Sequence, residues 1–209
     1  SSDGLTWTDF ETFIPSYGMN NAFVPTLISF ENKDLVVFQS SFINETRRSY
    51  QLYATEKGAN STTWSAASLI TDDVISSGKF SDYHNQRASL LYKDNKLYMA
   101  WERTHVSSEN SSIYFAELSK NGNIIDGGSL ISSGNGNASL PILFNYENKI
   151  NIVWFDTRKG VSTIYHGEKN GLFWNETALT SGKTEASFAY PIKTKDGFLH
   201  FFWQQTQSS

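Results

Sequence analysis

Four side chains suited to a polar ligand stand close together in the first half of the chain: Asp82, Tyr83, His84 and Arg87. An aromatic ring offers a flat face for stacking a sugar, and the polar groups beside it can exchange hydrogen bonds with hydroxyls. Most of them belong to Thr71–Gln86, a long connection, and long connections in compact repeats are often functional. We therefore predict a ligand site here. The alternative is an insertion that packs over the rim of the fold.

Three further polar residues follow predicted strands. Arg103 opens a predicted loop, Arg103–Ser111, and Asp156 and Arg158 lie in a turn two residues apart. The pattern predicts an Asp156–Arg158 contact at the surface, where an ion pair contributes about 0–1 kcal/mol. Both residues also remain candidates for ligand contact. The complete candidate ligand-binding set is Asp82, Tyr83, His84, Arg87, Arg103, Asp156 and Arg158.

Other kinds of chemistry find less support. The chain has no cysteine, which excludes disulfides, thiol catalysis and zinc–thiolate sites. Its four histidines lack metal-ligand spacing, and a solvated loop explains Asp72-Asp73 better than a Ca²⁺ site. A net charge of −4 disfavours nucleic acid. We expect no metal, no cofactor and no catalytic residue, and no membrane insertion, because no stretch approaches about 20 apolar residues.

The elements that position these residues form a repeat. Four segments resemble one another, each with two strand-like stretches around a turn of Asn, Asp, Lys or Gly. They are Val24–Gln39, Arg87–Glu102, Leu140–Phe155 and Phe188–Gln204. An aromatic residue holds the same place in each, at Phe38, Trp101, Trp154 and Trp203, with intervals of 63, 53 and 49 residues. Such an array buries its apolar faces only by stacking neighbouring units.

Two more strands follow three of the copies. The third strands are Gln51–Ala54, Ile113–Ala116 and Ile164–Gly167, and His166 is predicted to be a packed strand residue. The fourth strands are Trp64–Ile70, Ile124–Ile131 and Trp174–Thr180. Four strands per unit of roughly 40–50 residues are typical of a β-propeller blade. No segment has a helical apolar period, so the predicted fold class is all-β, a propeller of four-stranded antiparallel blades.

The segment Ser1–Trp7 (SSDGLTW) resembles the Asp-box, or BNR repeat, of sialidase-like propellers. Ser2, Asp3, Gly4, Thr6 and Trp7 carry the resemblance as structural turn residues, because carboxylate and hydroxyl groups bond the backbone of a tight turn. Degenerate copies occur at Glu56–Trp64, Leu118–Ile124 and Glu168–Trp174. The resemblance implies the fold for nearly the whole chain and says little about function, because one fold hosts many activities.

Active sialidases of this family need three arginines that clamp a carboxylate, the first in an Arg-Ile-Pro motif. The two nearest matches carry Phe23 and Ser139 where that arginine belongs, and Arg87 is one residue out of phase. The resemblance therefore does not extend to a complete catalytic set. The absence of cysteine fits an exported protein, and we expect an extracellular, cell-surface or periplasmic location.

Residues 1–209 are predicted to form one propeller domain or part of one. Complete blades are expected at about 22–70, 86–131 and 138–180, and partial blades at 1–14 and 187–204, as in a piece of a larger propeller. The first functional hypothesis is a non-catalytic module that binds carbohydrate or protein. The second is part of a sialidase or other glycoside hydrolase whose catalytic residues lie in further blades. The third is a homo-oligomer that pairs through open sheet edges.

Overall fold

The structure is a computed structural model of the chain. It describes residues 21–43, 48–71, 82–126, 128–132 and 134–206. Within these ranges the chain forms β-strands β1 to β14 and no helix. The predicted box residues Ser2, Asp3, Gly4, Thr6 and Trp7, and the partial blade expected at 1–14, lie outside the described residues.

The strands form four antiparallel sheets, each ordered along the chain. The first contains β1 (Phe23–Phe30), β2 (Lys33–Ile43), β3 (Arg48–Gly58) and β4 (Ser68–Leu69). The second contains β5 (Tyr83–Lys93), β6 (Lys96–His105), β7 (Ser111–Leu118) and β8 (Ser129–Leu130). The third contains β9 (Ala138–Tyr146), β10 (Lys149–Asp156), β11 (Thr163–Asn170) and β12 (Phe173–Ala178). The fourth, as described, contains β13 (Ala186–Lys193) and β14 (Leu199–Gln205).

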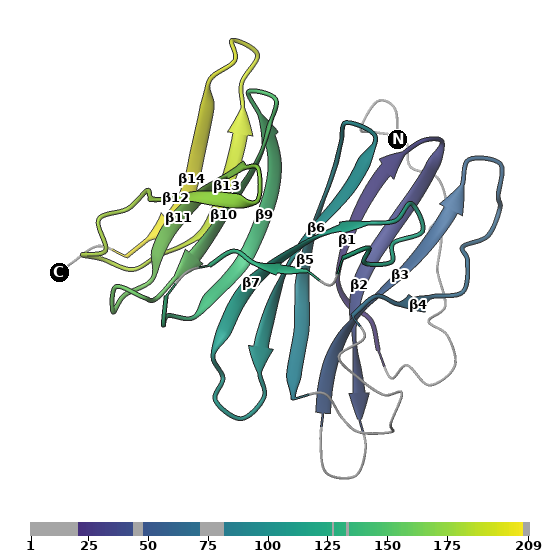
Figure 1. The fold of residues 1–209 in the computed structure, drawn as a ribbon, viewed down its shortest axis with the longest axis horizontal. Coiled ribbons are helices and arrows are strands. Elements are labelled where there is room, and N and C mark those ends of the chain that lie inside the picture. Colours follow the sequence, from purple (N-terminus) through teal and green to yellow (C-terminus); the bar gives the residue numbers. More distant parts are fainter. Residues whose placement is uncertain (1–20, 44–47, 72–81, 127, 133, 207–209) are drawn as a thin grey trace.

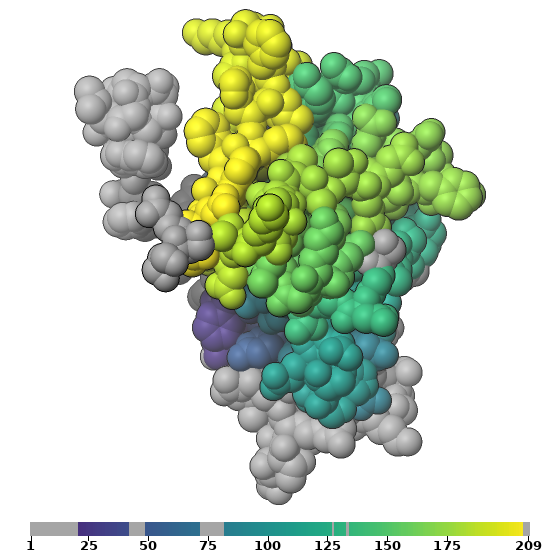
Figure 2. All heavy atoms as spheres, turned by 90° about the vertical axis from the view of Figure 1, so that its left-hand side faces the viewer, coloured from purple at the N-terminus to yellow at the C-terminus, as the bar shows by residue number. Residues whose placement is uncertain are grey.

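The sheets follow one another in chain order across the molecule, from purple to yellow (Figure 1). The first strands of neighbouring sheets contact each other: β5 packs against β1 and β9, and β13 packs against β9. Figure 2 shows the green third sheet and the yellow fourth sheet side by side. First strands around a common axis, with later strands radiating outwards, define a partial β-propeller. The fold class predicted from the sequence is confirmed.

Hairpin turns fix the register of the first two strands in each of the first three sheets. The turn pairs are Glu31-Asn32, Asp94-Asn95 and Glu147-Asn148, and every one of these residues has a positive φ between 46° and 62°. Two successive positive φ angles define the type I′ turn, whose twist matches that of the flanking strands. Asn tolerates this conformation better than most residues, which explains its recurrence at the second position.

A second repeated contact joins the two residues after the fourth strand to the third strand of the same sheet. The backbone N–H of Ile70 donates to the carbonyl of Leu52, and the hydroxyl of Thr71 accepts the N–H of Leu52. The pairs Ile131-Ser132 and Leu179-Thr180 bracket Ile113 and Ile164 in the same way. An apolar residue followed by Ser or Thr therefore closes each of the first three sheets.

Apolar cores lie between successive sheets. Leu35 and Val37 of the first sheet pack with Met99 and Trp101 of the second. Trp154 of the third sheet belongs to the next cluster, where it is 1% exposed. At Trp101 and Trp154 the shared aromatic residue thus fills space between neighbouring sheets, which is how a propeller stabilises units that cannot fold alone, whereas Trp203 is 40% exposed.

The structure corrects several predicted boundaries. β4 and β8 are two-residue strands, much shorter than Trp64–Ile70 and Ile124–Ile131, because these Ser-, Ala- and Gly-rich sequences are poor strand formers. Side-chain bonding replaces part of the ladder: Ser65 Oγ accepts the Glu56 N–H. The predicted loops Thr71–Gln86 and Arg103–Ser111 are also too long, because β5 and β6 take up their ends and so place Tyr83 and Arg103 on strands.

Candidate functional site around the propeller axis

The first strand of every sheet is interrupted at the same place. The pairing register shifts next to Val24, Arg87, Leu140 and Phe188, as in a β-bulge. These residues have φ angles of 45°, 53°, 52° and 53°. They are also the first residues of the four sequence copies. Positive φ is unusual for any of these residue types and an outlier for β-branched Val24, so the bulges mark a constrained part of the fold.

All four bulges converge on one cavity of about 280 Å³. Its lining is Val24, Arg87, Ala88, Leu140, Pro141, Ile142, Phe188, Ala189 and Tyr190. We call it the axial cavity, because the first strand of each sheet contributes to it. Among the described residues of the lining, Arg87 carries the only charge, so the cavity offers apolar walls and one guanidinium. A mostly apolar hollow with a few polar groups is typical of small-molecule sites.

Glu102 holds Arg87 in place. Arg87 Nη1 donates to Glu102 Oε1 at 2.6 Å, and Gln86 Nε2 donates to the same oxygen at 2.7 Å. The second carboxylate oxygen accepts a hydrogen bond from the hydroxyl of Ser139 in the third sheet. The Glu102 side chain is only 4% exposed, whereas that of Arg87 is 39% exposed. The guanidinium is therefore anchored from behind while part of it stays open to solvent.

The backbone of the same bulge is held by the first sheet. Arg87 N donates to Oε1 of Gln39 at 3.1 Å. Gln39 follows Phe38 as Glu102 follows Trp101, so the residue after the shared aromatic reaches the next sheet in both cases. Gln39 and Glu102 are not among the site residues that the sequence predicts. The sequence does contain a signal for them: a polar residue follows the shared aromatic residue in three copies, at Gln39, Glu102 and Gln204.

Of the predicted ligand-binding residues, Arg87 alone lines the axial cavity. Tyr83 and Arg103 are engaged with each other: the guanidinium carbon of Arg103 lies 4.0 Å from the centre of the Tyr83 ring and 5.1 Å from that of Tyr114. The Tyr83 ring also meets the His105 ring edge-on, with ring centres 5.1 Å apart. Asp82 is exposed, and its backbone carbonyl accepts the N–H of Val106. These residues pack the end of the second sheet.

His84 joins two sheets. Its Nδ1 accepts the backbone N–H of Tyr50 at 3.1 Å, and burial lowers the pKa of the imidazole below its usual 6.5. Asn137 stands at the corresponding place in the third sheet, where Oδ1 accepts the N–H of Ser111. The two side chains therefore perform the same task, accepting a backbone N–H near the start of the third strand in the preceding sheet. This role requires an unprotonated Nδ1.

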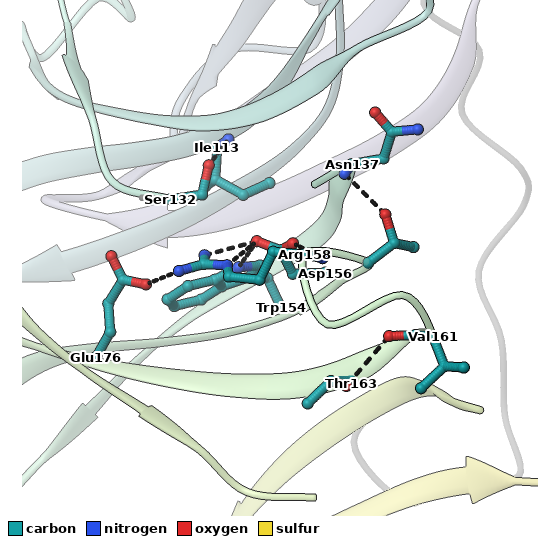
Figure 3. Close-up of polar contacts among 10 residues, drawn as sticks. Ile113, Ser132, Asn137, Trp154, Asp156, Arg158, Val161, Thr163 and Glu176 are labelled. Carbon is teal, nitrogen blue, oxygen red and sulfur yellow. Dashed lines mark hydrogen bonds and ion pairs between the residues drawn. The ribbon is translucent and has the colours of Figure 1, made fainter. Parts of the chain in front are cut away.

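Asp156, Arg158 and Glu176 form an ion cluster on the third sheet (Figure 3). Arg158 donates from Nη2 to Asp156 at 2.6 Å and from Nη1 to Glu176 at 2.7 Å, and its backbone N–H also binds Asp156. Burial works to lower the pKa of the guanidinium, but the bonds to the two carboxylates outweigh it and raise the pKa. The predicted Asp156–Arg158 contact exists. The expected surface position is wrong, because the Asp156 side chain is 2% exposed.

His166 lies on β11, as predicted, with Nε2 2.8 Å from Asn151 Oδ1. In the described part of the chain, no group of three or more His, Cys, Asp or Glu side chains is arranged to hold a metal ion. The described ranges likewise contain no helix of the length and apolarity that crossing a membrane requires.

Structural comparison finds β-propeller enzymes that act on glycosides. An α-L-arabinofuranosidase from Lactobacillus brevis matches 91% of this chain and 69% of its own, with a TM-score of 0.61 and 13% identity. A family 117 glycoside hydrolase of the marine bacterium Zobellia galactanivorans matches 96% and 71%, with a TM-score of 0.64 and 12% identity. The NanB sialidase from Streptococcus pneumoniae matches 92% and 49%, with a TM-score of 0.62 and 8% identity.

At these identities the likeness establishes the fold and leaves the chemistry open. No family model matches the sequence, and no curated protein matches it. The chain is therefore defined as a partial β-propeller similar in fold to glycoside hydrolases that include a sialidase.

Proposed function

We propose that the chain is part of a glycoside-hydrolase-type propeller and that its axial cavity binds a sugar unit. The observation that carries this proposal is the convergence of four non-glycine bulges on one cavity that contains an anchored, half-open arginine. Backbone strain repeated at one site indicates a constraint beyond folding. The fold shared with an α-L-arabinofuranosidase and a sialidase supports carbohydrate as the ligand class.

The lining favours a ring-shaped, hydroxyl-bearing ligand. Phe188 and Tyr190 are 65% and 58% exposed, so their rings are available for stacking beside the guanidinium of Arg87. Arg87 can donate to ring or hydroxyl oxygens, while its charge is already balanced by Glu102. A neutral sugar suits this balance, because an anionic ligand would have to compete with the Glu102 carboxylate for the same donor.

Hydrolysis of a glycosidic bond ordinarily needs two carboxyl groups, about 5–9.5 Å apart. No carboxylate lines the axial cavity among the described residues, and Glu102 is committed to Arg87, Gln86 and Ser139. Under the proposal, the acid and base therefore come from outside the described lining. The same observation favours the second candidate, a non-catalytic carbohydrate-binding module, which needs no carboxyl pair.

One experiment separates the two candidates. The full-length protein is incubated with arabinotriose, xylotriose and sialyllactose, and both product release and calorimetric binding are measured. Product release that is lost in Arg87→Gln supports the hydrolase. Binding without release, weakened by the same substitution, supports the module, and neither binding nor release rejects both. Export, protein ligands and edge-paired oligomers stay predictions of the sequence.

A further inference from the structure

A second cavity lies between the second and third sheets, at the end of the strands remote from the axial cavity. Its volume is about 330 Å³, within the range of about 300–1,000 Å³ found for small-molecule sites. Lys96, which begins β6 after the hairpin that follows β5, lines it, whereas Arg87 lies near the start of β5. We call it the inter-sheet cavity. Its third-sheet wall is the β11–β12 turn within Glu168–Trp174, the degenerate box segment noted in the sequence.

Aromatic rings form much of this wall. Trp174 meets Phe115 edge-on with ring centres 5.1 Å apart, and Tyr98 stacks on Phe115 at 5.5 Å. Leu172, at the rim, is 92% exposed, and the light-green segment that contains this turn projects from the surface in Figure 2. The rings are fixed by packing between two sheets, so they present a preformed surface. Aromatic surfaces of this kind stack against the apolar faces of sugar rings.

Three polar groups on the wall have no bonding partner in the described part of the protein. The Tyr98 hydroxyl, the Trp174 indole N–H and the Asp126 carboxylate make no side-chain hydrogen bond to any described residue, although all three residues line the cavity. Burial raises the pKa of Tyr98, so its hydroxyl stays protonated and can donate. Two donors and one acceptor around an open volume match the mixed hydrogen-bonding capacity of sugar hydroxyls.

The charges on the lining decide what kind of ligand fits. Lys96 and Lys169 are cationic, Glu117 and Asp126 are anionic, and the formal sum is zero. Lys96 and Glu117 already pair at 2.8 Å, and Lys169 lies over the Phe115 ring at 5.8 Å. The Asp126 carboxylate acts on Lys96 through its charge but makes no side-chain hydrogen bond to a described residue. It would repel a phosphate or carboxylate ligand, so a neutral polyhydroxyl ligand is favoured over an anion.

We propose that the inter-sheet cavity binds a neutral saccharide unit, which packs against Trp174 and bonds to Tyr98 and Asp126. This site is separate from the axial cavity and does not depend on the function proposed there. In an enzyme, this cavity would anchor a second part of the glycan chain at a distance from the bond that is cleaved. In a binding module, it would add a second contact to the same glycan and so raise the avidity.

The indole N–H resonance of Trp174 reports directly on this site. It is assigned in the intact protein with Trp174→Phe, and cellobiose, arabinobiose and lactose are titrated in turn. We expect at least one sugar to shift this resonance in a saturable way. Tyr98→Phe keeps the ring stack and removes the donor, and Asp126→Asn keeps the shape and removes the charge. Each should weaken the affinity about 2–10-fold, the usual effect of one lost hydrogen bond.

Arg87→Gln serves as the matched control, because residue 87 lines the axial cavity and not the inter-sheet cavity, so this titration should stay unchanged. The proposal is overturned if no sugar moves the Trp174 resonance. It is equally overturned if the shift occurs but both Tyr98→Phe and Asp126→Asn retain the affinity of the unmodified protein. Loss of axial binding in Arg87→Gln with the Trp174 titration intact would show that the two sites act separately.

Discussion

Arg87 and Glu102 form an ion pair at 2.6 Å that joins the axial cavity to the body of the second sheet. The carboxylate is buried and the guanidinium is partly open, so the pair is asymmetric. A buried carboxylate without its cation is costly, whereas an open guanidinium without its anion can be solvated. Because of this asymmetry, removing Arg87 should cost more stability than removing Glu102.

Arg87→Met should destabilise the protein by about 1–3 kcal/mol, because it strands the Glu102 carboxylate in a buried site. Urea unfolding measures the change in free energy. Adding Glu102→Gln to Arg87→Met should recover much of the loss, since the amide needs no cation. Lys96→Met provides the control, because the pair of Lys96 with Glu117 is solvent-exposed and its loss should change stability little. Equal losses in Arg87→Met and Lys96→Met would contradict the structure.

Arg158→Ala should be more damaging, with a loss of about 3–5 kcal/mol, because it removes the guanidinium that pairs with the buried Asp156 carboxylate and the partly buried Glu176 carboxylate. The matched control is Lys149→Ala, which breaks the exposed pair with Glu168. Thermal unfolding at neutral pH compares the two variants. If both lower the midpoint equally, the ion cluster contributes no more than a surface pair.

Gly136→Ala tests the packing beside the same cluster. A Cβ at this position would come within 2.1 Å of the backbone nitrogen of Arg158 and 2.3 Å of the Asp156 carboxylate. The turn that carries Arg158 must then move, so we expect a loss of about 1–3 kcal/mol in the free energy of unfolding. Gly160, whose Cβ would meet nothing, is the comparison, although its positive φ adds some strain of its own. A Gly136→Ala protein as stable as the unmodified one would refute this packing.

Stability should fall as the pH drops below about 6.5. Burial lowers the pKa of His84 in the folded protein, so below pH 6.5 the unfolded chain takes up a proton that the folded state resists. The contribution is complete above the unfolded pKa and is lost as the pH falls towards the folded one. His166, whose pKa is lowered by burial in the same way, adds to the effect.

The substitution His84→Asn isolates the first histidine, because Asn137 already performs the same bond in the next sheet. Asn at residue 84 should keep the acceptor for the Tyr50 N–H and flatten the decline between pH 6.5 and 5. Urea unfolding across this pH range measures it. An unchanged pH slope in His84→Asn would remove His84 from the explanation.

The fold could be predicted from the sequence because its determinants are local. Alternating strands, Asn-containing turns and one aromatic per copy recur in register, and the four copies begin at the four bulge residues. The sequence predicts longer fourth strands than β4 and β8, because the apolar residues Ile70 and Ile131 resemble strand residues. Ile70 and Ile131 instead close their sheets, and the strand pairing before them is limited to Ser68–Leu69 and Ser129–Leu130.

The site was less accessible, because its contacts join residues far apart in the chain. Glu102 meets Ser139 across 37 residues, and Gln39 meets the Arg87 backbone across 48. The chemical types of Tyr83, His84 and Arg103 suit a ligand site, but in the structure these residues make stacking contacts and inter-sheet bonds. Only Arg87, the charged member of the four bulges, combines the expected chemistry with a place on the cavity.

The most direct test of the axial site is a calorimetric titration of the intact protein with arabinotriose, repeated with Phe188→Ala. The Phe188 side chain is largely exposed, so its loss should leave the fold intact. The structure predicts saturable binding that becomes about 10-fold or more weaker in Phe188→Ala, consistent with removal of a stacking ring. Tyr98→Phe, in the other cavity, should bind arabinotriose at the axial site as the unmodified protein does. Binding that is unaffected by Phe188→Ala, or no binding by the unmodified protein, would contradict the assignment of the axial cavity as a carbohydrate site.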